Sequence, residues 1–169
     1  MKTIALAVAT LAVAAAPNAH AAGNSPTTGQ DQAYIRSSIE GDRFEVDGGR
    51  IALRISHNTK VRALAKRLIK DHRKSLSEAE HMARRLGIEI PRSPSTPEQW
   101  ELRMVGRESG TRFDIDYADL EVADHKQDIE EATHEWTHGG NLSVRLAARK
   151  ELPTLRKHLQ MSRRVLRSF

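Results

Sequence analysis

Residues 58–87 read NTKVRALAKRLIKDHRKSLSEAEHMARRLG, and this stretch decides the fold class. Its apolar residues recur every three or four positions, which is the spacing of one face of an α-helix. Asn58 is a good N-terminal cap for this helix, and Gly87 is a good left-handed residue for its end. His72 lies at the centre of the apolar face. The stretch therefore predicts one long amphipathic helix with a histidine on its core side.

Helical periodicity continues on both sides of this stretch, and no segment alternates like a β-strand. We expect long helices over residues 31–56, from Thr111 to the Gly139-Gly140 pair, and from Asn141 to the C-terminus. A proline-rich connection, IPRSPSTP at 90–97, leads into a short helix over 97–108, for which Thr96 is the expected cap and Gln99 closes a capping box. These elements predict an all-α fold: a four-helix bundle with an extra short helix between the second and third long helices.

The N-terminal segment has the pattern of a cleaved secretory signal peptide over residues 1–21. Lys2 supplies the positive charge, residues 4–16 are apolar, and Ala19-His20-Ala21 has the small-x-small form of a cleavage site. The apolar run is too short to span a bilayer, so we expect no membrane anchor. Residues 22–30 then form a flexible polar leader, and residues 31–169 form the bundle domain. The mature protein is expected in the periplasm or outside the cell, and with no cysteine it can form no disulfide.

The charges of the chain alternate by segment, although the formal net charge is +5. Residues 58–87 hold nine Lys/Arg against three Asp/Glu, residues 111–138 hold two against nine, and residues 142–169 hold eight against one. Neighbouring helices can use such segments to pair across their flanks. This pattern favours a solvated, complementary surface over a nucleic-acid partner.

One polar residue on each long helix faces the predicted core. His125 and His158 lie on the apolar faces of the third and fourth long helices, as His72 does on the second, whereas Glu45 lies nearer one edge of the face on the first. Counting residues from the turns places all four at one level within a helical turn. Inward, level ligands of this kind build the metal sites of helix bundles. Imidazole and carboxylate suit Fe, Mn, Zn or Cu, so a transition-metal ion is the partner we expect.

Four carboxylates are placed to complete such a site or to orient its ligands: Asp71, Asp114, Glu121 and Glu151. Two Glu-x-x-His motifs, ending at His81 and His134, have the spacing of di-iron ligands. Each of these histidines lies about 180° from the inward histidine of its own helix, so both are expected to face water. We therefore exclude them as core ligands.

A metal-free interpretation stays open, because a buried Glu/His network can satisfy its own members and fix helix register. The protein would then be a non-enzymatic envelope stress or interaction protein. The sequence contains no nucleophile–base arrangement, phosphate-binding glycine loop or nucleotide fingerprint, which favours a protein that is not an enzyme.

Four segments resemble a known family: FEVDGGRIAL at 44–53, IKDHRKS at 69–75, SGTRFDIDYADLEVADHK at 109–126 and LPTLRKHL at 152–159. Their order and spacing resemble bacterial domain-of-unknown-function family 4142, over about residues 31–166. The resemblance implies an exported protein of the ferritin-like superfamily, a family with no settled activity. The level cluster of inward residues is what predicts metal binding, for storage, buffering or envelope stress protection. The family's recurring positions fall on Glu45, Asp71, His72, Phe113, Asp114, Tyr117, His125, Pro153 and His158. The chain lacks the paired in-phase Glu-x-x-His motifs of ferritin-like enzymes, which argues against di-iron oxidase activity.

Overall fold

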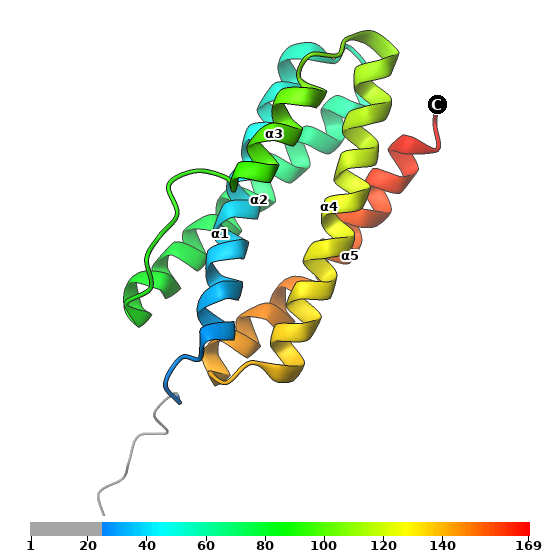
Figure 1. Cartoon of the computed structure of the whole chain (residues 1–169). Helices are drawn as coiled ribbons and strands as arrows, with labels where there is room; N and C mark the ends of the chain where they lie inside the picture. The colour runs from blue at the N-terminus through cyan, green and yellow to red at the C-terminus, as the bar shows by residue number, and fades with distance from the viewer. Residues whose placement is uncertain (1–24) are drawn as a thin grey trace, which may run out of the picture.

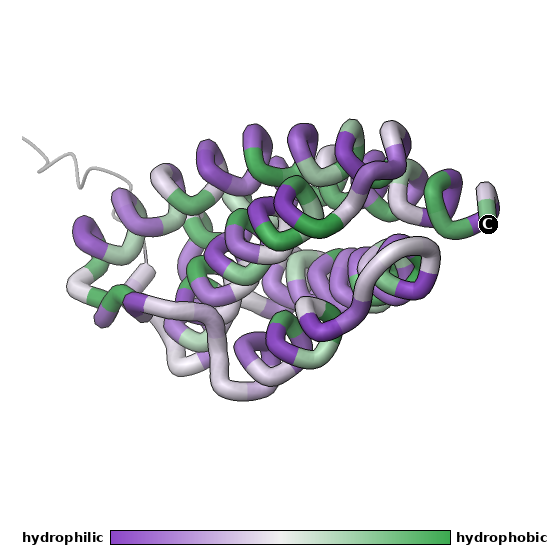
Figure 2. Tube along the Cα trace, turned by 90° about the horizontal axis from the view of Figure 1, so that it is seen from above, coloured by the Kyte–Doolittle hydropathy of each residue, from purple (hydrophilic) through white to green (hydrophobic). Residues whose placement is uncertain are grey.

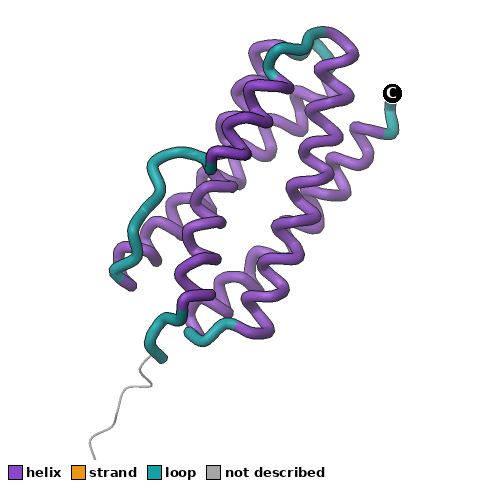
Figure 3. Tube along the Cα trace, viewed as in Figure 1, coloured by secondary structure: helices purple, strands orange, loops and turns teal. Residues whose placement is uncertain are grey.

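A computed structural model describes residues 25–169 and shows five helices and no strand in that range. The helices are α1 (Gly29–Ile55), α2 (Thr59–Leu86), α3 (Thr96–Val105), α4 (Gly110–His138) and α5 (Leu142–Leu166). The predicted signal peptide and the first residues of the predicted leader lie outside the described residues. The all-α prediction is confirmed, including the short helix that precedes the third long one (Figures 1 and 3).

The four long helices form two hairpins, α1 with α2 and α4 with α5, and the two hairpins pack against each other. The short helix α3 lies against α1 and α4 (Figure 1). Along each helix, hydrophobic and hydrophilic positions interleave (Figure 2), as expected for helices that bury one face.

Apolar side chains fill both ends of the bundle. At the end near the α1–α2 turn, the core includes Ala52, Leu64, Leu68, Phe113 and Tyr117. At the other end, two apolar clusters contain Ile35, Ile39, Ala83, Ile88, Val144, Ala132, Ala148, Leu152 and Leu155. Buried polar residues, among them Glu45, His72, His125 and His158, occupy the layer between these two ends.

The sequence predicted three of the helix boundaries correctly. The Asn58 side chain accepts from the backbone N–H groups of Lys60 and Val61, and Asn141 caps α5 in the same way. Gly87 ends α2 in the left-handed conformation, with φ of 68°. These three ends were predictable because their capping chemistry is local.

Other boundaries differ from the prediction. Helix α1 begins at Gly29, inside the predicted leader, because Thr28 and Asp31 form a capping box. For α3 the capping box joins Ser95 and Glu98, one residue earlier than the expected Thr96 and Gln99. Helix α4 begins at Gly110 after Ser109, with no side-chain cap, so Thr111 is not its cap.

Gly49 allows α1 and α2 to approach closely. A Cβ atom at Gly49 would lie 2.6 Å from Cγ1 of Ile69 and 3.1 Å from the carbonyl oxygen of Ala65. Both distances are shorter than ordinary van der Waals contacts, so only glycine fits at this helix crossing. This contact explains a glycine inside a helix, where glycine otherwise costs about 1 kcal/mol relative to alanine.

The expected pairing of charged flanks is present only in part. Lys150 of α5 lies 2.8 Å from Glu78 of α2, and Arg43 of α1 pairs with Glu80 of α2. The acidic residues of α4 behave differently, because Asp114, Glu121 and Glu135 are buried. None of the helices within residues 25–169 is long and apolar enough to cross a membrane.

Candidate metal centre

Three imidazole rings meet at the middle of the bundle, one each from α2, α4 and α5. His125 and His158 are fully buried, and His72 is 4% exposed. The ring centroids of His72 and His125 are 5.6 Å apart, those of His72 and His158 are 5.1 Å apart, and those of His125 and His158 are 5.2 Å apart. One ligand nitrogen from each ring lies within 4.8 Å of the others, so the group can hold a metal ion.

Each of these rings is held by an oxygen atom at one of its nitrogens. Nδ1 of His72 lies 2.8 Å from Oδ1 of Asp42, and Nε2 of His158 lies 2.9 Å from Oδ2 of Asp71. Nδ1 of His125 lies 2.8 Å from the backbone carbonyl oxygen of Glu121. Because a carbonyl or carboxylate oxygen accepts, these three nitrogens carry the ring protons.

The remaining nitrogen of each ring has no hydrogen-bond partner: Nε2 of His72, Nε2 of His125 and Nδ1 of His158. Burial lowers the pKa of His72 and of His158 to about 4, and that of His125 to about 3. The rings are therefore neutral near pH 7, and each unpartnered nitrogen presents a lone pair, which is the form that binds metals.

Two buried carboxyl groups adjoin the histidines. Oε1 of Glu45 is 3.5 Å and Oε2 of Glu121 is 3.7 Å from Nδ1 of His125, and Oε2 of Glu45 is 4.0 Å from Nε2 of His72. Neither oxygen of Glu45 has a hydrogen-bond partner. Burial, together with Glu121 and Asp124 nearby, raises the pKa of Glu45 well above its usual range, and burial raises that of Glu121 to about 8. Glu45, Glu121 and His125 form a second group that could hold a metal ion.

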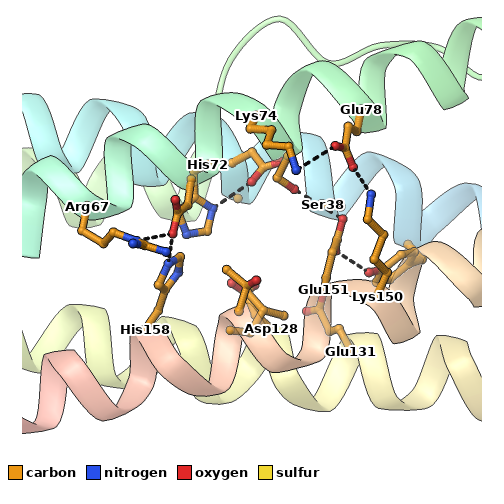
Figure 4. Close-up of a pocket in the computed structure, with 17 residues that line it drawn as sticks. Ser38, Arg67, His72, Lys74, Glu78, Asp128, Glu131, Lys150, Glu151 and His158 are labelled. Carbon is orange, nitrogen blue, oxygen red and sulfur yellow. Dashed lines mark hydrogen bonds and ion pairs between the residues drawn. The ribbon is translucent and has the colours of Figure 1, made fainter.

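A pocket of about 280 Å³ opens beside this cluster, between α1, α2, α4 and α5. His72 and His158 lie at one end of it, Asp128 lies in its middle, and Lys74, Glu78 and Lys150 lie at the other end (Figure 4). The imidazoles of His72 and His158 are thus buried within the bundle but border a cavity.

The sequence matches the model of one protein family, described as a domain of unknown function, DUF4142, over residues 15–165. The chain belongs to the DUF4142 family. None of the curated proteins compared with it gives a significant match. Among solved structures it is similar to a crystal structure of a DUF305 fragment from Deinococcus radiodurans, with a TM-score of 0.75 and 18% sequence identity. The likeness covers 86% of this chain and 100% of that fragment, and at this identity it shows the fold alone, a helical bundle.

Of the eight site residues predicted for this DUF4142 protein, six lie together. His72, His125, His158 and Glu45 form the cluster, Asp71 contacts His158, and Glu121 contacts His125. Glu45 is fully buried rather than near an edge, because it lies against His72 of α2 and His125 of α4.

The other two predicted carboxylates do not contact the histidines. Glu151 lines the adjacent pocket, where it accepts hydrogen bonds from the hydroxyls of Tyr34 and Ser75. Asp114 accepts from the hydroxyl of Ser56 at the end of α1, within the turn region of the bundle. It therefore stabilises the α1–α2 connection and does not orient a ligand.

The two Glu-x-x-His motifs of the DUF4142 chain face solvent, as predicted. His81 and His134 are both exposed. His134 stacks on His138 at the surface, with ring centroids 4.6 Å apart.

Asp42 is the main residue of the DUF4142 site that the sequence did not identify as a candidate. It shares the inward face of α1 with Glu45, which was the only signal in the sequence, and the structure buries it to 5% exposure. Its role depends on a contact with His72 of another helix, which periodicity within one helix cannot show. Asp124 was also missed; burial raises the pKa of its carboxyl to about 6.

Proposed function

We propose that this protein binds a transition-metal ion between His72, His125 and His158, with Glu45 as a fourth ligand. The observation that carries the proposal is the arrangement of the ring protons. All three are directed to oxygen atoms outside the triad, which leaves three unpartnered nitrogens in a buried cluster.

A cluster of lone pairs without donors is unfavourable when it is buried away from water. A cation satisfies all three nitrogens at once. The oxygen partners of the rings then act as the residues that fix imidazole orientation and tautomer around protein-bound metals. A Glu/His network without metal, the alternative interpretation, lacks this compensation, since Glu45 has one proton to donate and its closest free imidazole nitrogen is 4.0 Å away.

The donor set indicates which ions fit. Three imidazole nitrogens and one carboxylate suit Zn, Fe, Mn or Cu, and the chain has no thiol. A bound cation would also lower the pKa of the Glu45 carboxyl, because it stabilises the ionised form.

We further propose a ferritin-like four-helix arrangement for the bundle, and metal storage, buffering or envelope stress protection as its role. The pairing of α1 with α2 and of α4 with α5, with the buried polar level between them, supports the first point. The signal-peptide pattern of residues 1–21 supports a location in the periplasm or outside the cell. The proposed role is binding rather than catalysis.

The direct test is metal uptake by the purified mature chain. After equilibrium dialysis against Zn²⁺, Mn²⁺, Fe²⁺ or Cu²⁺, we expect near-stoichiometric retention of at least one metal and a raised melting temperature, since a ligand at 100 times its Kd stabilises by about 2.7 kcal/mol. His125→Ala and His158→Gln should abolish retention, whereas His81→Gln, at an exposed histidine of α2, should leave it unchanged. Absence of both uptake and a melting shift with all four metals would overturn the proposal.

A further inference from the structure

The pocket beside the histidines contains carboxyl groups that are not ligands of the proposed site. Asp42 and Asp128 line it from α1 and α4, and His72 and His158 border it from α2 and α5 (Figure 4). Because two proposed metal ligands border this pocket, it gives a route from solvent to the triad.

One of the two carboxyl oxygens of Asp42 contacts His72, and the other has no hydrogen-bond partner. Its Oδ1 is bonded to Nδ1 of His72, while its Oδ2 is buried and has no hydrogen-bond partner. The residue is only 5% exposed. An unpartnered carboxylate oxygen buried at a cavity is the kind of group that a cation or its hydration water satisfies.

Asp128 faces the same space and is surrounded by acids. The Asp42, Glu131 and Glu151 carboxyls lie near it, and with burial they raise the pKa of Asp128 well above its usual range. Its Oδ1 would be 3.8 Å from a Cβ at Gly41, which places the carboxyl against the backbone of α1. No ion pair found within residues 25–169 reaches Asp128.

The basic residues at the pocket are paired with other acids. Arg67 pairs with Asp71, and both Lys74 and Lys150 pair with Glu78. Glu151, by contrast, is held by hydrogen bonds from Tyr34 and Ser75. The pocket therefore has carboxylates paired with Lys or Arg at its two ends. In its interior, Asp42 and Asp128 have no Lys or Arg ion pair among the described residues, and burial raises the pKa of both well above the usual range.

We propose that this pocket is a second, weaker cation site, in which Asp42 and Asp128 hold a hydrated divalent transition-metal ion on its way to the histidine triad. This inference rests on the proposed function. Carboxylates bind such ions together with their water, and the imidazoles then replace water as ligands.

The test is the kinetics of Co²⁺ binding to the mature chain, followed by the absorption of the bound ion after rapid mixing. Asp128→Asn keeps the side-chain shape and removes the carboxyl group that would bind the ion. We expect this substitution to lower both the association rate and the dissociation rate of Co²⁺ on the order of 10-fold, with Kd nearly unchanged. The reason is that an intermediate binding site speeds both the entry and the exit of the ion. Asp119→Asn is the matched control, since Asp119 is an exposed aspartate of the same helix.

The outcomes separate this inference from the proposal on which it rests. Normal rates in Asp128→Asn would overturn the entry site while leaving the triad intact. A weaker Kd with an unchanged association rate would also overturn it, because it would make Asp128 part of the final site. If the unmodified chain binds neither Co²⁺ nor any of the four metals of the uptake experiment, the proposed function fails and the entry site with it.

Discussion

The chemistry that this protein can support depends mainly on its three buried histidines. A histidine on the apolar face of a helix loses water at both ring nitrogens, and one partner satisfies only one of them. In this bundle His72, His125 and His158 each have that single oxygen partner, and the second nitrogen of each ring is unpartnered. The pattern is simple to explain if the unpartnered nitrogens are metal ligands.

The contact between Asp42 and His72 predicts that metal affinity depends on Asp42. Asp42→Asn keeps the shape of the side chain but replaces the carboxyl group that contacts Nδ1 of His72 with an amide, which binds that ring proton less strongly. We expect metal affinity to fall by about 10–100-fold, as for other residues that orient metal-bound histidines. Competition titration with a chromophoric chelator measures the change. Asp47→Asn, on the solvent side of the same helix, is the control, and equal affinities for the two variants would show that Asp42 does not orient a ligand.

The sequence allowed the histidines to be predicted but not all of their partners. Each histidine is recognisable because it interrupts an apolar stripe of its own helix. Asp42 and Asp124 could not be selected among many acidic residues, since their importance arises from contacts with other helices. Asp114 was selected wrongly for the same reason: its partner, Ser56, lies at a helix end.

At the scale of the helices, the closeness of α1 and α2 determines where Asp42 and Glu45 meet His72. Gly49 permits that approach. We predict that Gly49→Ala destabilises the protein by about 1–3 kcal/mol, because the added methyl group overlaps Ile69 and the α2 backbone.

Gly41→Ala is the matched substitution on the same helix. A Cβ at Gly41 would meet nothing closer than 3.8 Å, so alanine should be neutral or stabilise by up to about 1 kcal/mol through helix propensity. Urea unfolding of both variants checks the pair. Similar stabilities for the two would contradict a close crossing at Gly49.

Helix boundaries were predictable where one residue type acts alone, as at Asn58 and Gly87. They were wrong by one or two residues where neighbouring Ser and Thr residues compete for the cap, as at Ser95 and Thr96. The position of α3 against α1 could not be predicted, because a short helix with no buried residue leaves no clear apolar stripe.

At the scale of the whole molecule, the layer of buried histidines and carboxyl groups in the middle of the bundle makes the stability of the metal-free protein depend on pH. The histidines have folded pKa values of about 3 to 4 against a usual 6.5, so the unfolded chain binds more protons and stability rises with pH up to about 6.5. Glu121 has a folded pKa of about 8 against a usual 4.5, so the folded chain binds more protons and stability falls as pH rises from about 4.5 to 8.

Above pH 6.5 the histidines are mostly neutral in both the folded and the unfolded chain, so the titration of the buried carboxyl groups dominates the pH dependence of stability. We therefore predict that the free energy of unfolding of the metal-free protein falls between pH 6.5 and 8, by on the order of 1–2 kcal/mol for a carboxyl such as Glu121. Urea denaturation in the presence of a chelator measures this change. Glu121→Gln should reduce the decline, and an unfolding free energy that rises over this interval would contradict the protonated state of the buried carboxyls.

The central claim is that a metal ion binds between the three buried imidazoles. Crystals grown with Zn²⁺ and measured at the zinc absorption edge test it directly, since an anomalous difference map locates the ion. If the ion binds there, we expect one dominant peak about 2.0–2.1 Å from a nitrogen of each of His72, His125 and His158. A map with no peak at the triad, and with zinc only at the exposed His134–His138 pair, would contradict it.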